Sequence, residues 1–304
     1  MKFRVVHRTR YDYSQPVVLA HSEARVRPRP TPAQTCGACT IAVDPLPAVR
    51  AEHVDAFGNT VLYFAVQDPH QSLTVTATSE VEVRAVAVPS TSPDWDAAVR
   101  LLHESAAAET RLARQFILDS PNAAASPALR AYAAPSLPTG RPLLDAVAEL
   151  SRRIHHDFVF DPESTTVATP LAEVLAQRHG VCQDFAHLAI ACLRAHGLAA
   201  RYVSGYLETE PPPGQERLQG ADVSHAWFAV YVPEVGWVDF DPTNDLLPTD
   251  RHVTTAWGRD YSDVTPLKGV IFGGGPHTLE VSVDMVRLDE EDAGPRTQVP
   301  GEAP

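Results

Sequence analysis

Three segments in the second half of the sequence carry side chains that could together cleave an amide bond. Cys182 follows a glycine turn and lies where an apolar stripe with helical spacing begins. The N-terminus of a helix carries partial positive charge and free N–H groups, which lower the pKa of a thiol and make it more nucleophilic. His225 begins one strand-like run, and Asp239 and Asp241 lie in the next one. A thiol, an imidazole and a carboxylate are the parts of a catalytic triad.

The register of a hairpin indicates which carboxylate could orient His225. The strands predicted over 225–232 and 237–241 flank a turn at 233–236, so they should pair antiparallel. Asp239 and Asp241 share one face of their strand because side chains alternate with a period of two. With the turn placed at its middle, Asp241 lies closer to His225 than Asp239 does, staggered by about three residues or on the order of 10 Å. A bulge or an asymmetric turn has to shorten this distance. We therefore predict that Asp241 orients His225.

The chemistry of such a triad makes further demands on the surrounding residues. The imidazole takes the thiol proton, and N–H groups at the helix start stabilise the oxyanion of the tetrahedral intermediate. The backbone N–H of Cys182 is one candidate donor and Gln183 is a second. Trp227 and Tyr202 could wall a substrate cleft or pack in the core.

A metal site is the alternative use of Cys182, His225 and Asp241. A zinc site would favour a second pair of ligands close together in sequence, and the sequence shows no such pair. Cys36 and Cys39 have CxxC spacing but are followed by a strand-like run, which is not typical of a redox motif. Cys192 falls on the apolar stripe of its helix and is predicted to fill the core. We predict no metal and no cofactor.

Composition excludes some classes of partner. The formal charge of −13, from 25 basic and 38 acidic residues, argues against nucleic acid and against anionic membranes. No run approaches the ~20 apolar residues of a membrane span, and the first residues do not resemble a signal peptide. We expect a cytoplasmic protein that acts on a peptide or a protein, and the oligomeric state stays open.

The patterns divide the 304 residues into four predicted parts. Short alternating runs at about ten-residue spacing favour an all-β, sandwich-like domain over residues 1–88. A helical linker region over 89–140 is followed by an α+β core over 141–288. Residues 289–304 are acidic and rich in glycine and proline, which predicts a flexible tail.

Four motifs together resemble those of the bacterial transglutaminase-like superfamily. They are Gly180-Val181-Cys182-Gln183-Asp184-Phe185-Ala186-His187-Leu188, Ala200-Arg201-Tyr202-Val203-Ser204-Gly205-Tyr206, Ser224-His225-Ala226-Trp227 and Gly236-Trp237-Val238-Asp239-Phe240-Asp241-Pro242-Thr243. Residues 1–85 are also similar to the N-terminal β domain of that family, with Tyr11-Asp12-Tyr13, Arg27-Pro28-Arg29 and the segment 55–59. The resemblance implies that Cys182, His225 and the aspartate of Asp241-Pro242-Thr243 form the triad in this chain order.

The resemblance also implies a fold and an activity. The fold would be a papain-like core, with the Cys-bearing helix packed on an antiparallel sheet that bears His225 and Asp241. The activity would be acyl chemistry on peptide or glutaminyl amides through a Cys182 thioester. Water as acceptor would make the protein a cysteine protease or amidase, and an amine would make it a transamidating enzyme. The alternative is a non-catalytic module that binds a peptide or a protein on the same core.

Overall fold

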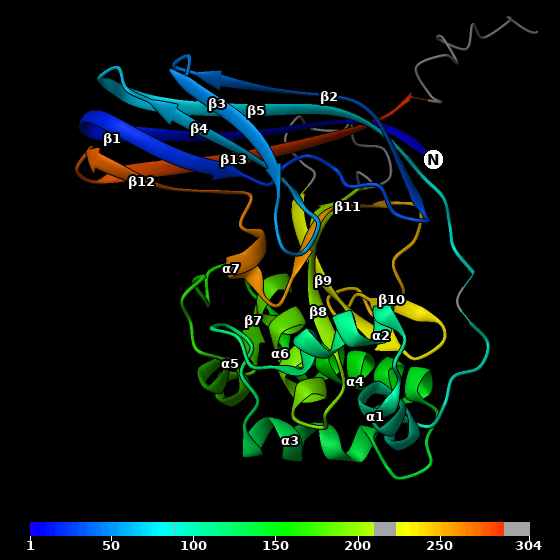
Figure 1. The fold of residues 1–304 in the computed structure, drawn as a ribbon. Coiled ribbons are helices and arrows are strands. Elements are labelled where there is room, and N and C mark those ends of the chain that lie inside the picture. The colour runs from blue at the N-terminus through cyan, green and yellow to red at the C-terminus, as the bar shows by residue number, and fades with distance from the viewer. Residues whose placement is uncertain (88, 210–222, 289–304) are drawn as a thin grey trace, which may run out of the picture.

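The chain folds into a curved antiparallel sheet that lies across an α+β core (Figure 1). The computed structural model describes residues 1–87, 89–209 and 223–288. The predicted acidic tail over 289–304 lies outside the described residues. The α+β class predicted from the sequence is confirmed, with a β-rich N-terminal region in front of the core. In the described part of the chain, no helix has the length and apolar character that a bilayer crossing requires.

The N-terminal region forms most of a seven-stranded sheet within the described residues. Its strands are β1 (Lys2–Ala24), β2 (Gln34–Asp44), β3 (Val49–Val54), β4 (Thr60–Val66) and β5 (His70–Val83), in the order β2-β5-β1-β4-β3. Residues of β2 and β4, which are not neighbours in the sheet, belong to one buried cluster that includes Ile41, Val43, Leu62 and Phe64. The sheet therefore curls around its own core. This explains why the alternating short runs in its sequence favoured a sandwich-like domain.

Two strands from the end of the described chain complete this sheet. β12 (Leu267–Gly273) and β13 (His277–Arg287) both pair antiparallel with β1. The sequence analysis placed these residues in the core segment 141–288. The difference has a physical reason, because the long strand β1 pairs with β5 and β4 on one edge and presents its other edge to β12 and β13. Pairing between strands more than 240 residues apart leaves no trace in the local alternation of polarity.

The core contains a four-stranded antiparallel sheet with the order β10-β9-β8-β11. The strands are β8 (Ala200–Leu207), β9 (Val223–Val232), β10 (Gly236–Phe240) and β11 (His252–Gly258). Helix α6 (Cys182–Arg194) packs on one face, against the alternate residues Ala226, Phe228 and Val230 of β9. The Cys-bearing helix on an antiparallel sheet is the arrangement that the resemblance implied.

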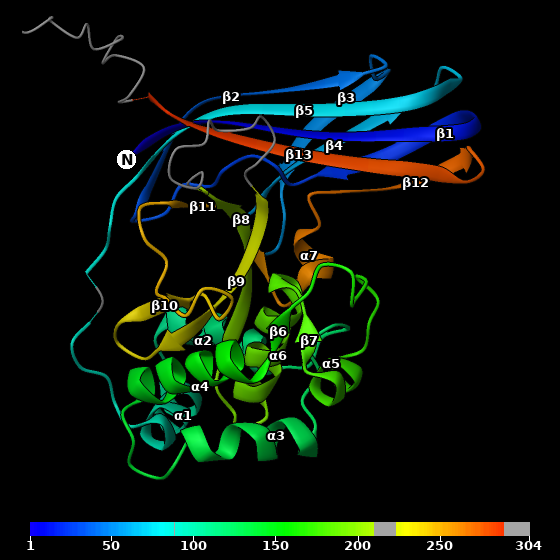
Figure 2. The same ribbon diagram turned by 180° about the vertical axis from the view of Figure 1, so that it is seen from behind.

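The remaining helices lie around α6, most of them on its side away from the curved sheet, while α7 lies between that sheet and α6 (Figure 2). They are α1 (Trp95–Glu104), α2 (Ala108–Ala113), α3 (Pro127–Ala133), α4 (Leu143–Asp157), α5 (Leu171–Gln177) and the short α7 (Tyr261–Val264). The segment 89–140, predicted as a linker, contributes Ala98, Leu129 and Ala133 to the same buried cluster as α4 and α6. It is thus a packed layer of the core. Its apolar runs are short and are interrupted by alanine and proline, so the sequence did not indicate that this segment packs into the core.

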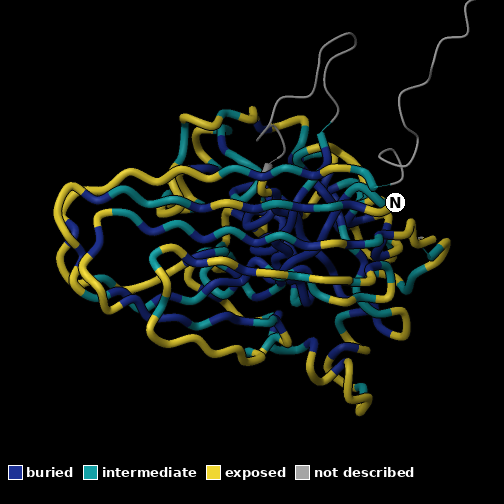
Figure 3. Tube along the Cα trace, turned by 90° about the horizontal axis from the view of Figure 1, so that it is seen from above, coloured by how far each residue is buried: buried dark blue, intermediate teal, exposed yellow. Residues whose placement is uncertain are grey.

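The two layers are joined by apolar contacts and by side-chain amides. Phe3, Val5 and Met285 of the curved sheet share a buried cluster with Tyr206 and Val253 of the core sheet. Figure 3 shows the buried residues concentrated where the curved sheet covers the core, while the hairpin ends extend beyond it and are exposed. The amides bind the free edge of β11, since an unpaired edge strand has to be covered.

Gln34 and Asn59 supply the side-chain amides at this edge, where the backbone N–H of Arg29 also donates to the Thr254 oxygen at 3.2 Å. The side chain of Gln34 accepts a hydrogen bond from the Thr254 N–H at 2.9 Å and donates to the Thr254 oxygen at 2.8 Å. Asn59 makes the same pair of bonds with Trp257, at 3.0 and 2.8 Å. Each amide therefore imitates one residue of a neighbouring strand.

We expect Gln34→Ala to destabilise the protein by about 1–3 kcal/mol, because it leaves the buried backbone N–H of Thr254 without a partner. Urea unfolding measures this change in the free energy of unfolding. Gln177→Ala is the matched control, because Gln177 is exposed and bonds only Glu173 within its own helix. Equal stability of the two variants would show that the amide does not hold the layers together.

Candidate active site

The start of α6 is fixed by a buried carboxylate. Asp184, in the first turn, accepts hydrogen bonds from the Val181 N–H at 2.9 Å and from the Thr165 hydroxyl at 2.7 Å. A Cβ at Gly180 would lie 2.9 Å from Asp184, so the glycine is required for this close approach. Cys182 is the first residue of the helix and is partly exposed. The local sequence thus places a thiol at the positive end of the helix dipole.

His225 and Asp241 are in direct contact. The Nε2 atom of His225 donates to Oδ2 of Asp241 at 2.8 Å, and both side chains are buried. The regular pairing of β9 with β10 ends at Phe240, and Asp241 then bridges back to Leu246 through backbone hydrogen bonds of 2.9 and 3.3 Å. The observed register pairs Phe240 with Phe228, which brings Asp241 to within two residues of the level of His225 instead of the expected three. The loop at the end of β10 closes the remaining stagger.

Cys182 is the second residue that acts on His225. The Cys182 side chain is close enough to His225 to raise the pKa of the imidazole. Because Nε2 is bound to Asp241, Nδ1 is the nitrogen that faces the sulfur. The structure therefore brings together all three residues that the sequence pointed to for the triad.

The protonation of the pair follows from its surroundings. Burial alone would lower the pKa of His225, but the bonds and charges of Asp241 and Cys182 raise that pKa to about 10. Burial would likewise raise the pKa of Asp241, yet its bonds from His225, His252 and Asn244 hold that pKa well below its ordinary value. Asp241 is thus ionised and His225 is held as an imidazolium at neutral pH.

A second histidine contacts the same carboxylate and was missed in the sequence. The Nδ1 atom of His252 accepts the Thr249 N–H at 3.2 Å, so Nε2 carries the proton and donates to Oδ2 of Asp241 at 3.2 Å. Asn244 donates to the same oxygen at 2.7 Å. His252 begins β11, for which no strand was predicted, and its only sequence signal is its position after the loop that follows Asp241. It is a positioning residue, because it acts through Asp241.

We expect His252→Phe to lower kcat by about tenfold or more with little change in KM, because a charge-assisted hydrogen bond to Asp241 is lost. His252→Gln keeps a side-chain N–H donor and should restore most of the rate. Steady-state kinetics of both variants measure kcat and KM separately. A parallel loss in both variants would mean that His252 serves only packing.

The other residues singled out from the sequence lie around this centre. Gln183 is beside Cys182 in the first turn of α6 and is partly exposed. Tyr202 is buried on the α6 side of the sheet, with its ring centre 4.9 Å from that of His187. Trp227 is fully buried, with its ring centre 6.0 Å from that of His225 and 5.4 Å from that of His252. Tyr202 and Trp227 therefore support the site from within the core.

His225, Asp241 and His252 also form a cluster that could hold a metal ion. Their candidate ligand atoms all lie within 4.8 Å of one another. However, Oδ1 of Asp241 accepts the N–H groups of Thr243 and Asn244, and Oδ2 accepts from His225, His252 and Asn244. Donors thus surround both oxygens, which favours a hydrogen-bonded carboxylate over a metal ligand.

Comparison with known proteins agrees with this architecture. Residues 3–82 match the bacterial transglutaminase-like N-terminal region, and residues 130–242 match the transglutaminase-like superfamily. An uncharacterized protein of Mycobacterium tuberculosis is 43% identical over 299 residues, which cover 95% of this chain and 93% of that protein. A protein-glutamine gamma-glutamyltransferase of Pseudomonas aeruginosa is 33% identical over 106 residues, or 34% of this chain and 16% of that enzyme.

A solved structure has the same fold over nearly the whole chain. It is described as a "Putative Cysteine Protease" from Cytophaga hutchinsonii, and it matches with a TM-score of 0.70 and 21% sequence identity. The match covers 95% of this chain and 92% of that chain. At this identity the likeness speaks for the fold. The assignment to a family rests instead on the two family matches and on the Mycobacterium tuberculosis relative. The chain belongs to the transglutaminase-like superfamily, and the bacterial transglutaminase-like N-terminal region precedes its core.

Proposed function

We propose that the protein transfers the acyl group of a peptide amide through a thioester on Cys182. The observation that carries this proposal is the double contact of one buried imidazole. His225 is bound to Asp241 through one ring nitrogen and faces Cys182 with the other. This is the relation of base to nucleophile and orienting carboxylate in a triad.

The reaction begins with the thiol proton on Nδ1 of His225 and the sulfur as thiolate. The thiolate attacks the amide carbon and the carbonyl oxygen becomes an oxyanion. When the C–N bond breaks, His225 gives its proton to the leaving nitrogen, and an amine departs. Water then attacks the thioester with His225 as base, and a carboxylic acid and the free thiol are formed.

The oxyanion would be stabilised at the start of α6. The first N–H groups of a helix have no acceptor within it, and the Cys182 and Gln183 amides belong to this turn. The Val181 N–H is already bound to Asp184, so it is not available. The backbone N–H of Cys182 is the first donor of the proposed oxyanion hole, and Gln183 supplies the second.

The acceptor of the acyl group distinguishes two outcomes of the same mechanism. Water gives hydrolysis, as in a cysteine protease or amidase, and we take it as the primary outcome. A primary amine in place of water gives transamidation, the type of reaction for which the Pseudomonas aeruginosa relative is named. Both need the same three residues and no cofactor.

Intact-mass trapping tests the proposal. The protein is incubated with glutaminyl and general peptide libraries, with and without a primary amine, and is quenched in acid. We expect a mass increase on Cys182 that matches an acyl group, and a released acid or amine-coupled product that identifies the acceptor. Peptide binding without any adduct or product would overturn the proposal in favour of a non-catalytic binding module.

A further inference from the structure

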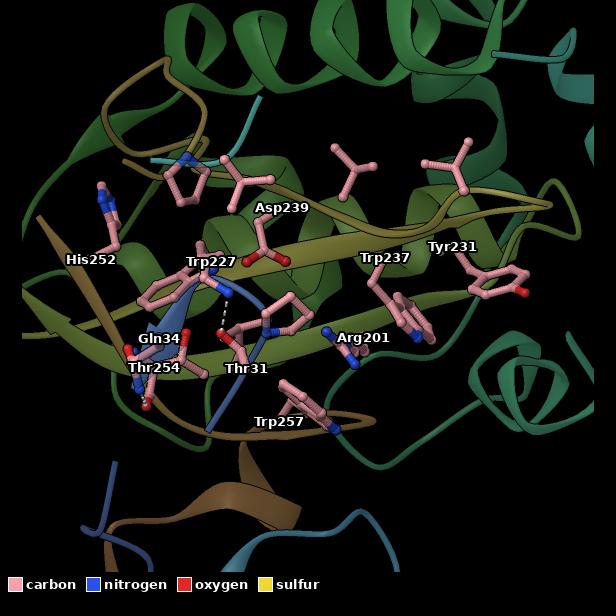
Figure 4. Close-up of a pocket in the computed structure, with 18 of the residues that line it drawn as sticks. Thr31, Gln34, Arg201, Trp227, Tyr231, Trp237, Asp239, His252, Thr254 and Trp257 are labelled. Carbon is pink, nitrogen blue, oxygen red and sulfur yellow. Dashed lines mark hydrogen bonds between the residues drawn. The ribbon is translucent and has the colours of Figure 1, made fainter. Parts of the chain in front are cut away.

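A cavity lies on the face of the core sheet opposite α6 (Figure 4). Its volume is about 750 Å³, within the usual range for small-molecule sites. The walls come from β8, β9 and β10, from the loop before β2, from α2 and from the segment before β11. Its mouth is lined by exposed residues that include Arg84, Val86, Glu109 and Leu112. We call this cavity the Arg201 pocket.

Arg201 is a buried cation without a bonded partner. Its side chain extends from β8 into the pocket, and the residue is only 7% exposed. Its guanidinium lies over the rings of Trp237 and Trp257, 4.3 and 3.7 Å from the ring centres. Its Nε atom is buried without an acceptor, and Arg201 forms no hydrogen bond or ion pair with another residue in the described ranges. Most buried arginines are paired, so this one calls for an acceptor.

Asp239 supplies a charge of the opposite sign to the same pocket. It projects from β10 toward the space beside Trp227 in Figure 4. The charge of Arg201 acts on Asp239 through space, and no hydrogen bond joins the two side chains. Burial lowers the pKa of Arg201 to about 9, against the opposing effect of Asp239, so the guanidinium stays charged at neutral pH. Burial raises the pKa of Asp239, and the charge of Arg201 and the Trp227 side chain oppose that rise. Arg201 and Asp239 thus face one cavity without a hydrogen bond between them.

The apolar walls are suited to the rest of a small ligand. Val203, Trp227, Trp237 and Trp257 line the cavity beside the two charged groups. The ring of His252 also lines it, and the same residue bonds Asp241. The pocket is therefore separated from the triad by a single layer of side chains. Cys182 and His225 are not among its lining residues.

We propose that the Arg201 pocket binds a small ligand with both a carboxylate and an amino group, of the size of an amino acid or dipeptide. The carboxylate pairs with Arg201, because a guanidinium with free N–H groups matches its geometry. The amino group pairs with Asp239, and the apolar body of the ligand lies against the three indoles. Such a ligand gives Arg201 a carboxylate and Asp239 an ammonium group at once, and it adds no net charge to the pocket.

Binding of leucyl-leucine tests this proposal, measured by calorimetry and by tryptophan fluorescence. Three of the four tryptophans line the pocket, so their emission reports occupancy directly. The measurement uses Cys182→Ala protein, which prevents turnover of the probe. We expect leucyl-leucine to bind at least tenfold more tightly than its N-acetyl or its C-terminal amide derivative. Absence of binding at millimolar concentration, or equal binding of either capped peptide, overturns the proposal.

Two variants locate the ligand in the pocket. Arg201→Met and Asp239→Asn should each weaken leucyl-leucine binding by about tenfold or more. Arg84→Met is the control, because Arg84 is a cation at the mouth that already bonds Glu82. It should bind the dipeptide within twofold of the parent protein. Unchanged binding in Arg201→Met would place the ligand elsewhere, and if that variant does not fold, the capped peptides still decide.

Discussion

Cys182→Ala should abolish amide cleavage and lower kcat/KM by about 10⁴-fold or more, with the fold intact. Removing a triad nucleophile leaves only the contribution of binding and the oxyanion hole, which explains the expected size of the loss. The fold should survive because Cys182 is partly exposed at the start of α6, and the helix start is held by Asp184 instead. The measurement is steady-state hydrolysis of the peptide identified by trapping, together with circular dichroism and thermal unfolding.

Cys36→Ala is the matched control for this prediction. Cys36 is also a free, partly exposed thiol, but it lies in β2 of the curved sheet, and burial raises its pKa. Its loss should leave kcat/KM unchanged. If Cys182→Ala retained activity, or if both variants lost it equally, the thioester mechanism would be wrong. Retained peptide binding without turnover in the parent protein would point to the binding module instead.

Local patterns in the sequence were enough to place each triad residue on its element, whereas the pairing of Cys182 with His225, 43 positions apart, was expected from triad chemistry and from the family resemblance. The glycine turn and the apolar stripe place Cys182 at a helix start, and the hairpin of β9 and β10 brings His225 near the end of its partner strand. Counting from the turn preferred Asp241 over Asp239, and in the structure Asp239 faces the Arg201 pocket. These inferences succeed because each depends on residues fewer than about 20 positions apart.

Features that depend on distant segments could not be predicted in the same way. The pairing of β12 and β13 with β1 joins the two ends of the described chain. β11 is an edge strand whose outer backbone groups bind the amides of Gln34 and Asn59. Without that strand, nothing in the sequence indicates that His252 meets Asp241. The stagger of about 10 Å was also an ideal-strand value, which the observed register and the loop after β10 remove.

The same long-range contacts explain why the N-terminal region belongs to the site. β11 carries His252, and its edge is covered by residues of the curved sheet. Arg29, from the segment between β1 and β2, stacks over Trp257 at 3.2 Å from the ring centre. The curved sheet therefore stabilises the strand that presents His252 to the triad. This link gives the N-terminal region a positioning role without a direct contact to Cys182.

Asp241→Asn should lower kcat/KM by about 10³-fold or more at neutral pH, although it is isosteric. All the groups around this side chain are hydrogen-bond donors, from His225, His252, Asn244 and two backbone N–H groups. An amide has one acceptor oxygen and one NH₂ group, so in either orientation donors face donors. The imidazole then loses both its orientation and the charge that stabilises its protonated form.

The pH dependence gives this prediction a second readout. His225 is protonated below its pKa of about 10, and catalysis needs that proton for the leaving amine, so activity should fall as pH rises toward 10. Loss of the Asp241 charge lowers the pKa of His225, and the alkaline limb should move to lower pH. Asp245→Asn is the control, because this substitution removes the same charge from an exposed residue. Asp245 has φ 49°, a backbone conformation that asparagine tolerates. An alkaline limb that stays in place in Asp241→Asn would show that the carboxylate does not set the protonation of His225.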